Sequence, residues 1–117
     1  MKIAEPRRGE IWWVDWSPGR GSEQIGRRPA LVIQVDAANR NPHYPNTVVL
    51  TISSKGREVP FHVTLAPSRI NGLHMTSYVH CEQIMTISKD RLEARLGQVT
   101  PGELAQVEHG MRLVVGI

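Results

Sequence analysis

The chain has 117 residues, of which 40% are hydrophobic and 21% are charged, and its formal net charge is +3. This length suits one domain around one hydrophobic core, and the mixture of charges of both signs excludes a disordered chain. The basic balance is compatible with a nucleic-acid ligand and equally with solubility alone, because the sequence does not place the charges on one face.

The distribution of cysteine, histidine and apolar residues excludes several further classes of protein. Cys81 is the single cysteine, so no internal disulfide can form, and we expect a reducing, cytoplasmic setting. The N-terminus lacks the apolar segment of a signal peptide, and no run approaches the roughly 18 apolar residues that span a bilayer. The five histidines are scattered without metal-ligand spacing, so we expect no metal site and no cofactor.

Runs rich in apolar and β-branched residues predict strands over residues 11–16, 30–35, 47–53 and 59–65, with one or two short strands within 77–87. The first run alternates, so that Trp12, Val14 and Trp16 share one face while Ile11 and Trp13 share the other. Both faces are apolar, which predicts a strand buried on both sides.

Turn residues separate these runs. Residues 36–46 form a polar loop with two prolines and several asparagines. Residues 54–57, Ser-Lys-Gly-Arg, predict a tight turn and therefore a hairpin between the two strands that flank it. Ser88 is a candidate cap for a single helical turn over residues 89–92.

The C-terminal segment carries the clearest helix signal. Thr100 and Glu103 form a capping box around Pro101. The apolar stripe that follows at helical spacing consists of Leu104, Val107, Met111 and Val114. We therefore predict a strand-rich body closed by one amphipathic helix that runs to Val115 and stops at Gly116.

The loop after the first strand brings one carboxylate close in sequence to two guanidiniums. Glu23 lies in the Gly-rich segment 17–26, and Arg27 and Arg28 follow it directly. Loops held by a rigid sheet are common positions for binding and catalytic groups, and Arg matches phosphate oxygens in a bidentate way. The pattern predicts chemistry on a phosphate.

Three segments closely resemble the MazF/PemK family of toxin–antitoxin ribonucleases: GEIWWVDWSPGRGSEQIGRRPALVI from Gly9, VVLTISS from Val48 and CEQIMTISKDRL from Cys81. The resemblance implies a mainly β fold, a small SH3-like antiparallel barrel of the MazF/PemK/CcdB type with a C-terminal helix. It implies a homodimer and a metal-independent endoribonuclease that cuts single-stranded RNA by 2′-OH attack, leaving 2′,3′-cyclic phosphate and 5′-hydroxyl ends. Such toxins are held inactive by a cognate antitoxin whose disordered tail covers the RNA groove.

The resemblance also implies roles for individual residues. Arg28 matches the phosphate-stabilising position and is also a candidate proton donor, and Thr51 matches an active position whose hydroxyl can donate to a phosphate oxygen. Glu23 is a candidate base or an orienter of Arg28. In one branch of the family, an Arg-x-Asp acid and base pair matches the position of His80 and Glu82 here. Two residues apart in a strand, these two point to one face and are candidates for proton transfer, with a structural hydrogen bond as the alternative.

Candidate RNA contacts surround this set. Trp16 is the candidate stacking platform for a base, whereas Trp12 and Trp13 are expected to fill the core. Asn39 and Asn41 are candidates for reading base edges. The remaining candidates for RNA contact are Ser22, Arg27, Ser53, Lys55, Arg57 and Gln83.

Two alternatives share the same fold. A gyrase-poisoning toxin acts by binding alone, and the chain's end, Val-Val-Gly-Ile, resembles the C-terminal Trp-Gly-Ile of that group without its Trp. The catalytic-loop residues, present as a set, favour the nuclease. An inactive RNA-binding domain that has kept the barrel is the other alternative.

Overall fold

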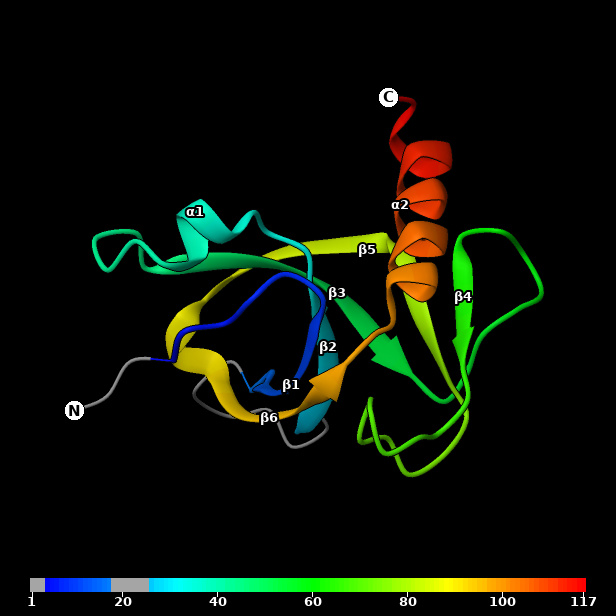
Figure 1. Ribbon diagram of the computed structural model, residues 1–117, viewed down its shortest axis with the longest axis horizontal. Coiled ribbons are helices and arrows are strands. Elements are labelled where there is room, and N and C mark those ends of the chain that lie inside the picture. The colour runs from blue at the N-terminus through cyan, green and yellow to red at the C-terminus, as the bar shows by residue number, and fades with distance from the viewer. Residues whose placement is uncertain (1–3, 18–25) are drawn as a thin grey trace.

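The computed structural model describes residues 4–17 and 26–117, which form one curved antiparallel sheet with helices at its margins (Figure 1). Its elements are β1 Glu10–Asp15, β2 Arg27–Val32, α1 Asp36–Asn39, β3 Asn46–Ser53, β4 His62–Leu65, β5 Ser77–Ser88, the 3₁₀ turn η1 Lys89–Arg91, β6 Leu92–Gln98 and α2 Pro101–Val115. The strand order is β4-β5-β3-β2-β1-β6. The mainly β, antiparallel expectation is confirmed. Among the described residues the sheet curls toward a barrel without pairing its two edge strands.

Alternation along the central strands builds two apolar cores, one on each face of the sheet. Leu31 belongs to the first core, which also receives Val107 from α2, while Ala30 belongs to the second. In β1, Ile11 faces the first core and Val14 the second, and both are fully buried. The first strand therefore contributes to both cores, as its sequence predicts.

The predicted helix ends are confirmed. Thr100 Oγ1 accepts the Glu103 N–H at 3.1 Å, and Glu103 Oε1 accepts the Thr100 N–H at 2.8 Å, which completes the capping box. Gly116 ends α2 in the left-handed conformation, with φ of 75°. Ser88 caps η1 by accepting the N–H of Asp90. No helix in the described part of the chain has the length and hydropathy needed to cross a membrane.

The predicted hairpin between β3 and β4 is wrong, because β5 lies between these strands and pairs with both. β5 buries Val79 and Cys81 completely, so it suits an interior position. The short strand β4 exposes Thr64 and suits an edge. A local turn signal cannot report that a later strand inserts between its two flanking runs.

The strand β6 is absent from the sequence prediction. Its residues 93–95 are exposed, and its pairing with β1 contains two register shifts, so it shows no regular alternation. Its position beside β1 follows from pairing across the sheet, not from a pattern within β6.

The segment around α1 holds a buried polar cluster, so the proposal that Asn39 reads RNA bases is wrong. Asn39 is 1% exposed, and its Oδ1 accepts hydrogen bonds from Gln34 at 2.9 Å and from Thr47 at 2.8 Å. The buried ammonium of Lys89 donates to the backbone carbonyls of Asn39 and Asn41 at 2.9 and 3.2 Å. These contacts hold the loop in place, and Asn41 remains exposed.

We expect Gly110→Ala to lower the free energy of unfolding by about 1–3 kcal/mol, because a Cβ there would overpack the contact between α2 and the sheet. That Cβ would lie 2.8 Å from Cys81 Sγ and 3.1 Å from the Pro60 carbonyl oxygen. This outweighs the gain of about 1 kcal/mol that Ala brings to a helix. Gly102→Ala is the control, since its nearest neighbour is 4.0 Å away. Urea unfolding measures both variants, and equal stabilisation of the two would contradict the packing argument.

Candidate active site

The register of the sheet aligns four residues in one row across four strands. Ala30 in β2 lies opposite Thr51 in β3, Thr51 lies opposite His80 in β5, and His80 lies opposite His62 in β4. Directly opposed residues of antiparallel strands point to the same face. The row therefore extends the face of the second core, to which Ala30 belongs, out to the edge of the sheet.

A hollow of about 450 Å³ opens beside this row. It is lined by Trp16, Arg28, Thr51, Ile52, Ser53, Lys55, His80 and Gln83. Arg28 lies two positions before Ala30, and Ser53 lies two positions after Thr51, so alternation puts both on the face of the row. Every lining residue except Ile52 was a candidate from the sequence, although whether each acts on RNA stays a prediction.

A bulge in β5 shapes one side of the hollow. Leu50 and Thr51 are adjacent in β3, but their partners in β5 are Ile84 and His80. Residues 81–83 therefore have no partner in β3. The bulge brings the Gln83 side chain toward the row, whereas regular alternation from His80 would direct it to the opposite face.

Two side chains of the bulge contact the row directly. The Thr51 hydroxyl donates to Gln83 Oε1, which orients the hydroxyl at the wall of the hollow. Glu82 Oε2 lies 3.0 Å from His62 Nε2 and 3.8 Å from His80 Nδ1. Glu82 therefore lies on the side of His80 that faces away from the hollow, and it is not among the described residues that line the hollow.

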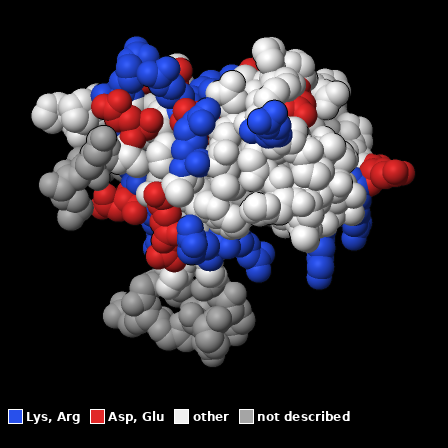
Figure 2. All heavy atoms as spheres, turned by 60° about the horizontal axis from the view of Figure 1, so that its bottom comes forward, with Lys and Arg blue, Asp and Glu red and all other residues white. Residues whose placement is uncertain are grey.

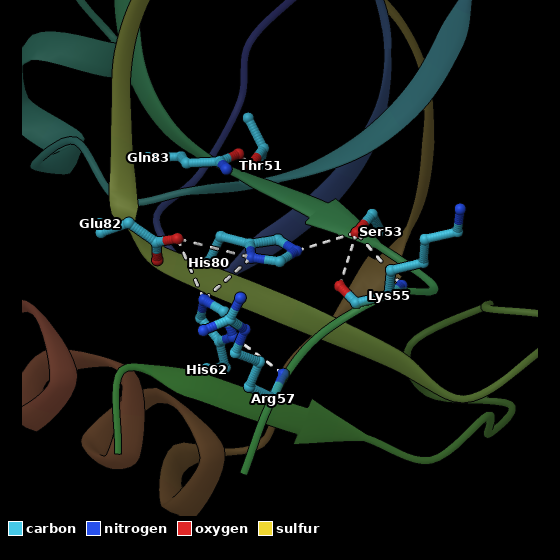
Figure 3. A network of polar contacts seen from close by, with 8 residues as sticks. All are labelled: Thr51, Ser53, Lys55, Arg57, His62, His80, Glu82 and Gln83. Atoms are coloured by element: carbon cyan, nitrogen blue, oxygen red, sulfur yellow. Dashed lines mark hydrogen bonds and ion pairs between the residues drawn. The ribbon is translucent and has the colours of Figure 1, made fainter. Parts of the chain in front are cut away.

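The two histidines join this carboxylate in a continuous polar network (Figure 3). His80 Nδ1 is 3.3 Å from His62 Nε2, and His80 Nε2 is 2.8 Å from Ser53 Oγ. The backbone N–H of Arg57 donates to His62 Nδ1 at 3.0 Å. The network connects the edge strand β4 to the wall of the hollow.

The hydrogen-bond partners of His62 and His80 determine the tautomer of each ring. Because Nδ1 of His62 accepts a backbone N–H, the neutral ring carries its proton on Nε2 and donates to Glu82. The Ser53 hydroxyl donates to the Lys55 carbonyl at 2.9 Å, so its oxygen accepts the Nε2–H of His80. His80 therefore presents an N–H at the hollow and a lone pair, on Nδ1, toward the carboxylate.

Burial and neighbouring charges set the ionisation of this network. Burial lowers the pKa of His80 below its ordinary value and His62 lowers it further, while Glu82 acts in the opposite direction. Burial acts to raise the pKa of the Glu82 carboxyl, but the hydrogen bond from His62, a backbone hydrogen bond and the two histidines' charges hold it below its ordinary value. At neutral pH the network therefore holds a neutral His80 beside a carboxylate.

The thiol in the bulge has a structural role. Cys81 is fully buried, and its Sγ lies 3.7 Å from the Val107 carbonyl oxygen in α2. Burial, with the nearby charge of Glu82, raises the pKa of the Cys81 thiol to about 11. It stays protonated at neutral pH and packs against the helix, so it is not a nucleophile.

Arg27 does not line the first hollow. It forms an ion pair with Glu93 and lies over the ring of Trp13, 5.3 Å from the ring centroid, at a neighbouring hollow of about 470 Å³. Trp13 is half-buried beneath this guanidinium, so the prediction that it fills the core is wrong. Trp12 packs against the second core as predicted.

The other sequence candidates fall into three groups. Lys55 and Ser53 line the hollow, whereas Arg57 contacts the network through its backbone N–H. Ser22 and Glu23 lie outside the described residues. The proposed orientation of Arg28 by Glu23 therefore stays a prediction.

His62 is the residue that sequence reasoning missed. It lies 18 residues from His80, and no spacing motif connects the two. Only the register of β4 against β5 brings the rings together, at a centroid distance of 4.5 Å. The argument that scattered histidines exclude a metal site therefore fails for the folded chain, because His62, His80 and Glu82 converge.

Charges of both signs alternate on the face shown in Figure 2, where basic and acidic groups lie side by side and a broad area is uncharged. Cations elsewhere are compensated locally, as in the Arg8–Glu108 and Arg95–Glu10 pairs, each at 2.8 Å. The arrangement of cations around the hollow, more than the net charge, is therefore what can select a phosphate.

Residues 7–115 match the family described as the PemK-like, MazF-like toxin of type II toxin–antitoxin systems. The chain belongs to this toxin family, which confirms the resemblance seen in the sequence.

Two curated relatives and one solved structure specify the likeness further. The chain is 38% identical over 111 residues to endoribonuclease MazF9 of Mycobacterium tuberculosis, covering 92% of this chain and 93% of the relative. It is 32% identical over 113 residues to endoribonuclease MazF of Staphylococcus saprophyticus, covering 95% and 92%. A mycobacterial endoribonuclease in complex with its cognate antitoxin superposes with a TM-score of 0.78 at 28% identity, covering 96% of each chain. The enzyme class that these relatives support is the endoribonuclease.

We expect the ring of His80 to titrate below its ordinary value of 6.5 in metal-free buffer. Glu82→Gln should lower this midpoint further, because the carboxylate raises the pKa, and His62→Gln should raise it. The pKa of His80 is lower in the folded chain than in the unfolded chain, so the unfolded chain takes up a proton first as the pH falls. The contribution of His80 to the free energy of unfolding therefore falls as the pH drops below 6.5. NMR titration of the ring protons measures all three midpoints. Shifts in the same direction in both variants would contradict this assignment.

Proposed function

We propose that the chain is the toxin of a type II toxin–antitoxin system that cleaves single-stranded RNA at short motifs without a metal ion. The observation that carries the proposal is the convergence of Arg28, Thr51 and His80 on one hollow, together with Trp16. Family membership and the endoribonuclease relatives support the same activity.

In the proposed reaction the 2′-hydroxyl of the RNA attacks the adjacent phosphorus, and the bond from phosphorus to the 5′ oxygen breaks. The departing 5′ oxygen takes up a proton from water, so the products are a 2′,3′-cyclic phosphate and a 5′-hydroxyl. Negative charge develops on the phosphoryl oxygens, so donors placed around the phosphate lower the barrier. Arg28 provides a permanent positive charge and a bidentate donor, and the Thr51 hydroxyl provides a neutral donor.

His80 is the third donor in this mechanism. Its Nε2–H is donated to Ser53 Oγ at the wall of the hollow, and burial keeps the ring neutral near pH 7. In this proposal the N–H exchanges Ser53 for a phosphoryl oxygen and stabilises charge by hydrogen bonding. Glu82 acts from behind by holding the His62 and His80 rings in position. Glu23 is the proposed acceptor of the 2′-hydroxyl proton, on the strength of the family motif.

The RNA chain itself requires a binding surface beside the phosphate. We propose that a base stacks on Trp16, which is half-buried against the second core and lines the hollow. Lys55 is exposed at the same hollow and supplies a cation for a neighbouring phosphate. Gln83 can hydrogen-bond a base edge once Thr51 turns to the substrate.

The proposed partners are a cognate antitoxin and a second copy of the chain. A similar endoribonuclease was solved with its cognate antitoxin, which supports an antitoxin partner. We propose that the tail of this antitoxin covers the RNA groove. The last turn of α2 projects from the molecule and exposes Leu113, Val114 and Val115, an apolar surface that a homodimer could cover (Figure 1). A cytoplasmic location is proposed because the mRNA substrate is found there.

We expect Arg28→Ala to reduce RNA cleavage in EDTA by about 10²–10³-fold, because the phosphate loses its permanent cation. Arg69→Ala, which removes an exposed arginine from the 66–76 connection, should cleave at the wild-type rate. Mapping the ends of a long single-stranded RNA measures the rate, the motif and the 5′-hydroxyl products together. A folded wild-type protein that cuts no RNA would contradict the proposal and favour a toxin that acts by binding, such as a gyrase poison.

We expect Thr51→Val to lower the rate of bond cleavage by about 10²-fold with little change in RNA affinity, because the hydroxyl acts mainly on charge in the transition state. Thr64→Val on the exposed edge of β4 is the matched control and should change neither quantity. Single-turnover cleavage and RNA-binding titrations separate the two effects. Equal losses of affinity and rate would reassign Thr51 as a binding residue.

A further inference from the structure

His62, His80 and Glu82 bring three potential metal ligands to one point from two strands (Figure 3). His62 belongs to β4, and the other two belong to β5. Their ligand atoms, Nε2, Nδ1 and a carboxylate oxygen, all lie within 4.8 Å of one another. Two imidazoles and one carboxylate form a ligand set that proteins use for Zn²⁺ with an open fourth position.

The separations between the three atoms fit a tetrahedral ion. Bonds of about 2.0–2.1 Å to Zn²⁺ place neighbouring tetrahedral ligands about 3.3–3.4 Å apart. The separations are 3.0 Å from His62 to Glu82, 3.3 Å from His62 to His80 and 3.8 Å from His80 to Glu82. They bracket the tetrahedral value, so small side-chain rotations suffice to surround an ion.

The burial of the two histidines and the hydrogen bond from His80 to Ser53 favour metal binding at these ligands. The His62 and His80 side chains are 9% and 10% exposed, and Glu82 is 33% exposed, which leaves solvent access on the carboxylate side. His80 would bind the ion through Nδ1 while its Nε2–H keeps its hydrogen bond to Ser53 Oγ. A hydrogen bond from the second ring nitrogen to a neighbouring oxygen is the usual support for a metal-bound histidine.

Binding has one identifiable cost, at His62. Its Nε2 must lose the proton it carries, which moves to Nδ1, where it faces the N–H of Arg57. The hydrogen bond between that N–H and Nδ1 is then lost. Arg57 belongs to the same turn as Lys55, which lines the hollow, so ion binding is coupled to the wall of the candidate active site.

We propose that His62 Nε2, His80 Nδ1 and Glu82 Oε2 form an inhibitory Zn²⁺ site. The bound ion locks His80 and Glu82 and releases the turn that carries Lys55, so RNA cleavage slows. The inhibition rests on the proposed function, whereas the binding of Zn²⁺ does not. The site differs from a catalytic metal centre in its expected behaviour, since removal of the ion should restore activity.

The test begins with the EDTA-treated full chain, titrated with Zn²⁺ by calorimetry and with Co²⁺ by visible absorption. We expect one ion per chain with the absorption of tetrahedral Co²⁺, and a perturbed Arg57 amide signal in NMR spectra of the Zn²⁺ form. His62→Gln and Glu82→Gln should each weaken Zn²⁺ binding by at least about 100-fold. His43→Gln, in the exposed loop after α1, is the matched control and should bind like the wild type. Circular dichroism verifies folding, and Glu82→Gln, at an exposed position, serves if His62→Gln fails to fold.

Absence of Zn²⁺ binding, or binding that survives both ligand substitutions, overturns the site. Loss of binding in His43→Gln overturns it too. RNA cleavage is then measured with and without Zn²⁺, followed by EDTA. Binding without inhibition overturns the inhibitory role alone. A chain that binds Zn²⁺ yet never cleaves RNA would refute the proposed function while supporting the site.

Discussion

The pairing of β5 with β3 on one edge and with β4 on the other aligns the hydroxyl and the two imidazoles of the candidate site. Opposed residues in antiparallel strands share a face, so this register aligns Thr51, His80 and His62 in one row. Residues 81–83, which have no partner in β3, place a carboxylate and an amide beside the same row. A slip of one residue would turn each side chain to the opposite face. The hollow and the histidine cluster therefore depend on the same pairing.

Burial determines which polar groups of the candidate site are charged and which are neutral. Arg28 is exposed near the start of β2 and lines the hollow, so its charge is accessible to a phosphate. His80 is 8% exposed, and a buried imidazolium is costly, so its ring stays neutral and donates its N–H to Ser53 Oγ at the wall of the hollow. The site thus combines a permanent cation with a neutral donor. This combination suits the stabilisation of a crowded, negatively charged phosphate.

His62 Nε2, His80 Nδ1 and Glu82 Oε2 can either hydrogen-bond to one another or bind an ion, because hydrogen-bond distances and the separations of tetrahedral ligands are similar. In the protonated arrangement, His62 donates to Glu82 and keeps the Arg57 N–H on its other nitrogen. An ion replaces the shared proton at the expense of that backbone hydrogen bond. The supply of Zn²⁺ therefore decides which arrangement the network adopts, and the turn beside the hollow responds to that choice.

The sequence by itself determined the features whose signals are short-range. The capping box at Thr100 and the stop at Gly116 were predictable because each depends on residues within a few positions. The family motif likewise identified Arg28 and Thr51, which the fold brings together at one hollow. Only the tertiary structure decided the insertion of β5 between β3 and β4, the bulge, and the meeting of His62 with its partners. Cross-strand neighbours are selected by the burial and hydrogen bonding of the whole sheet, and no spacing along the chain records that choice.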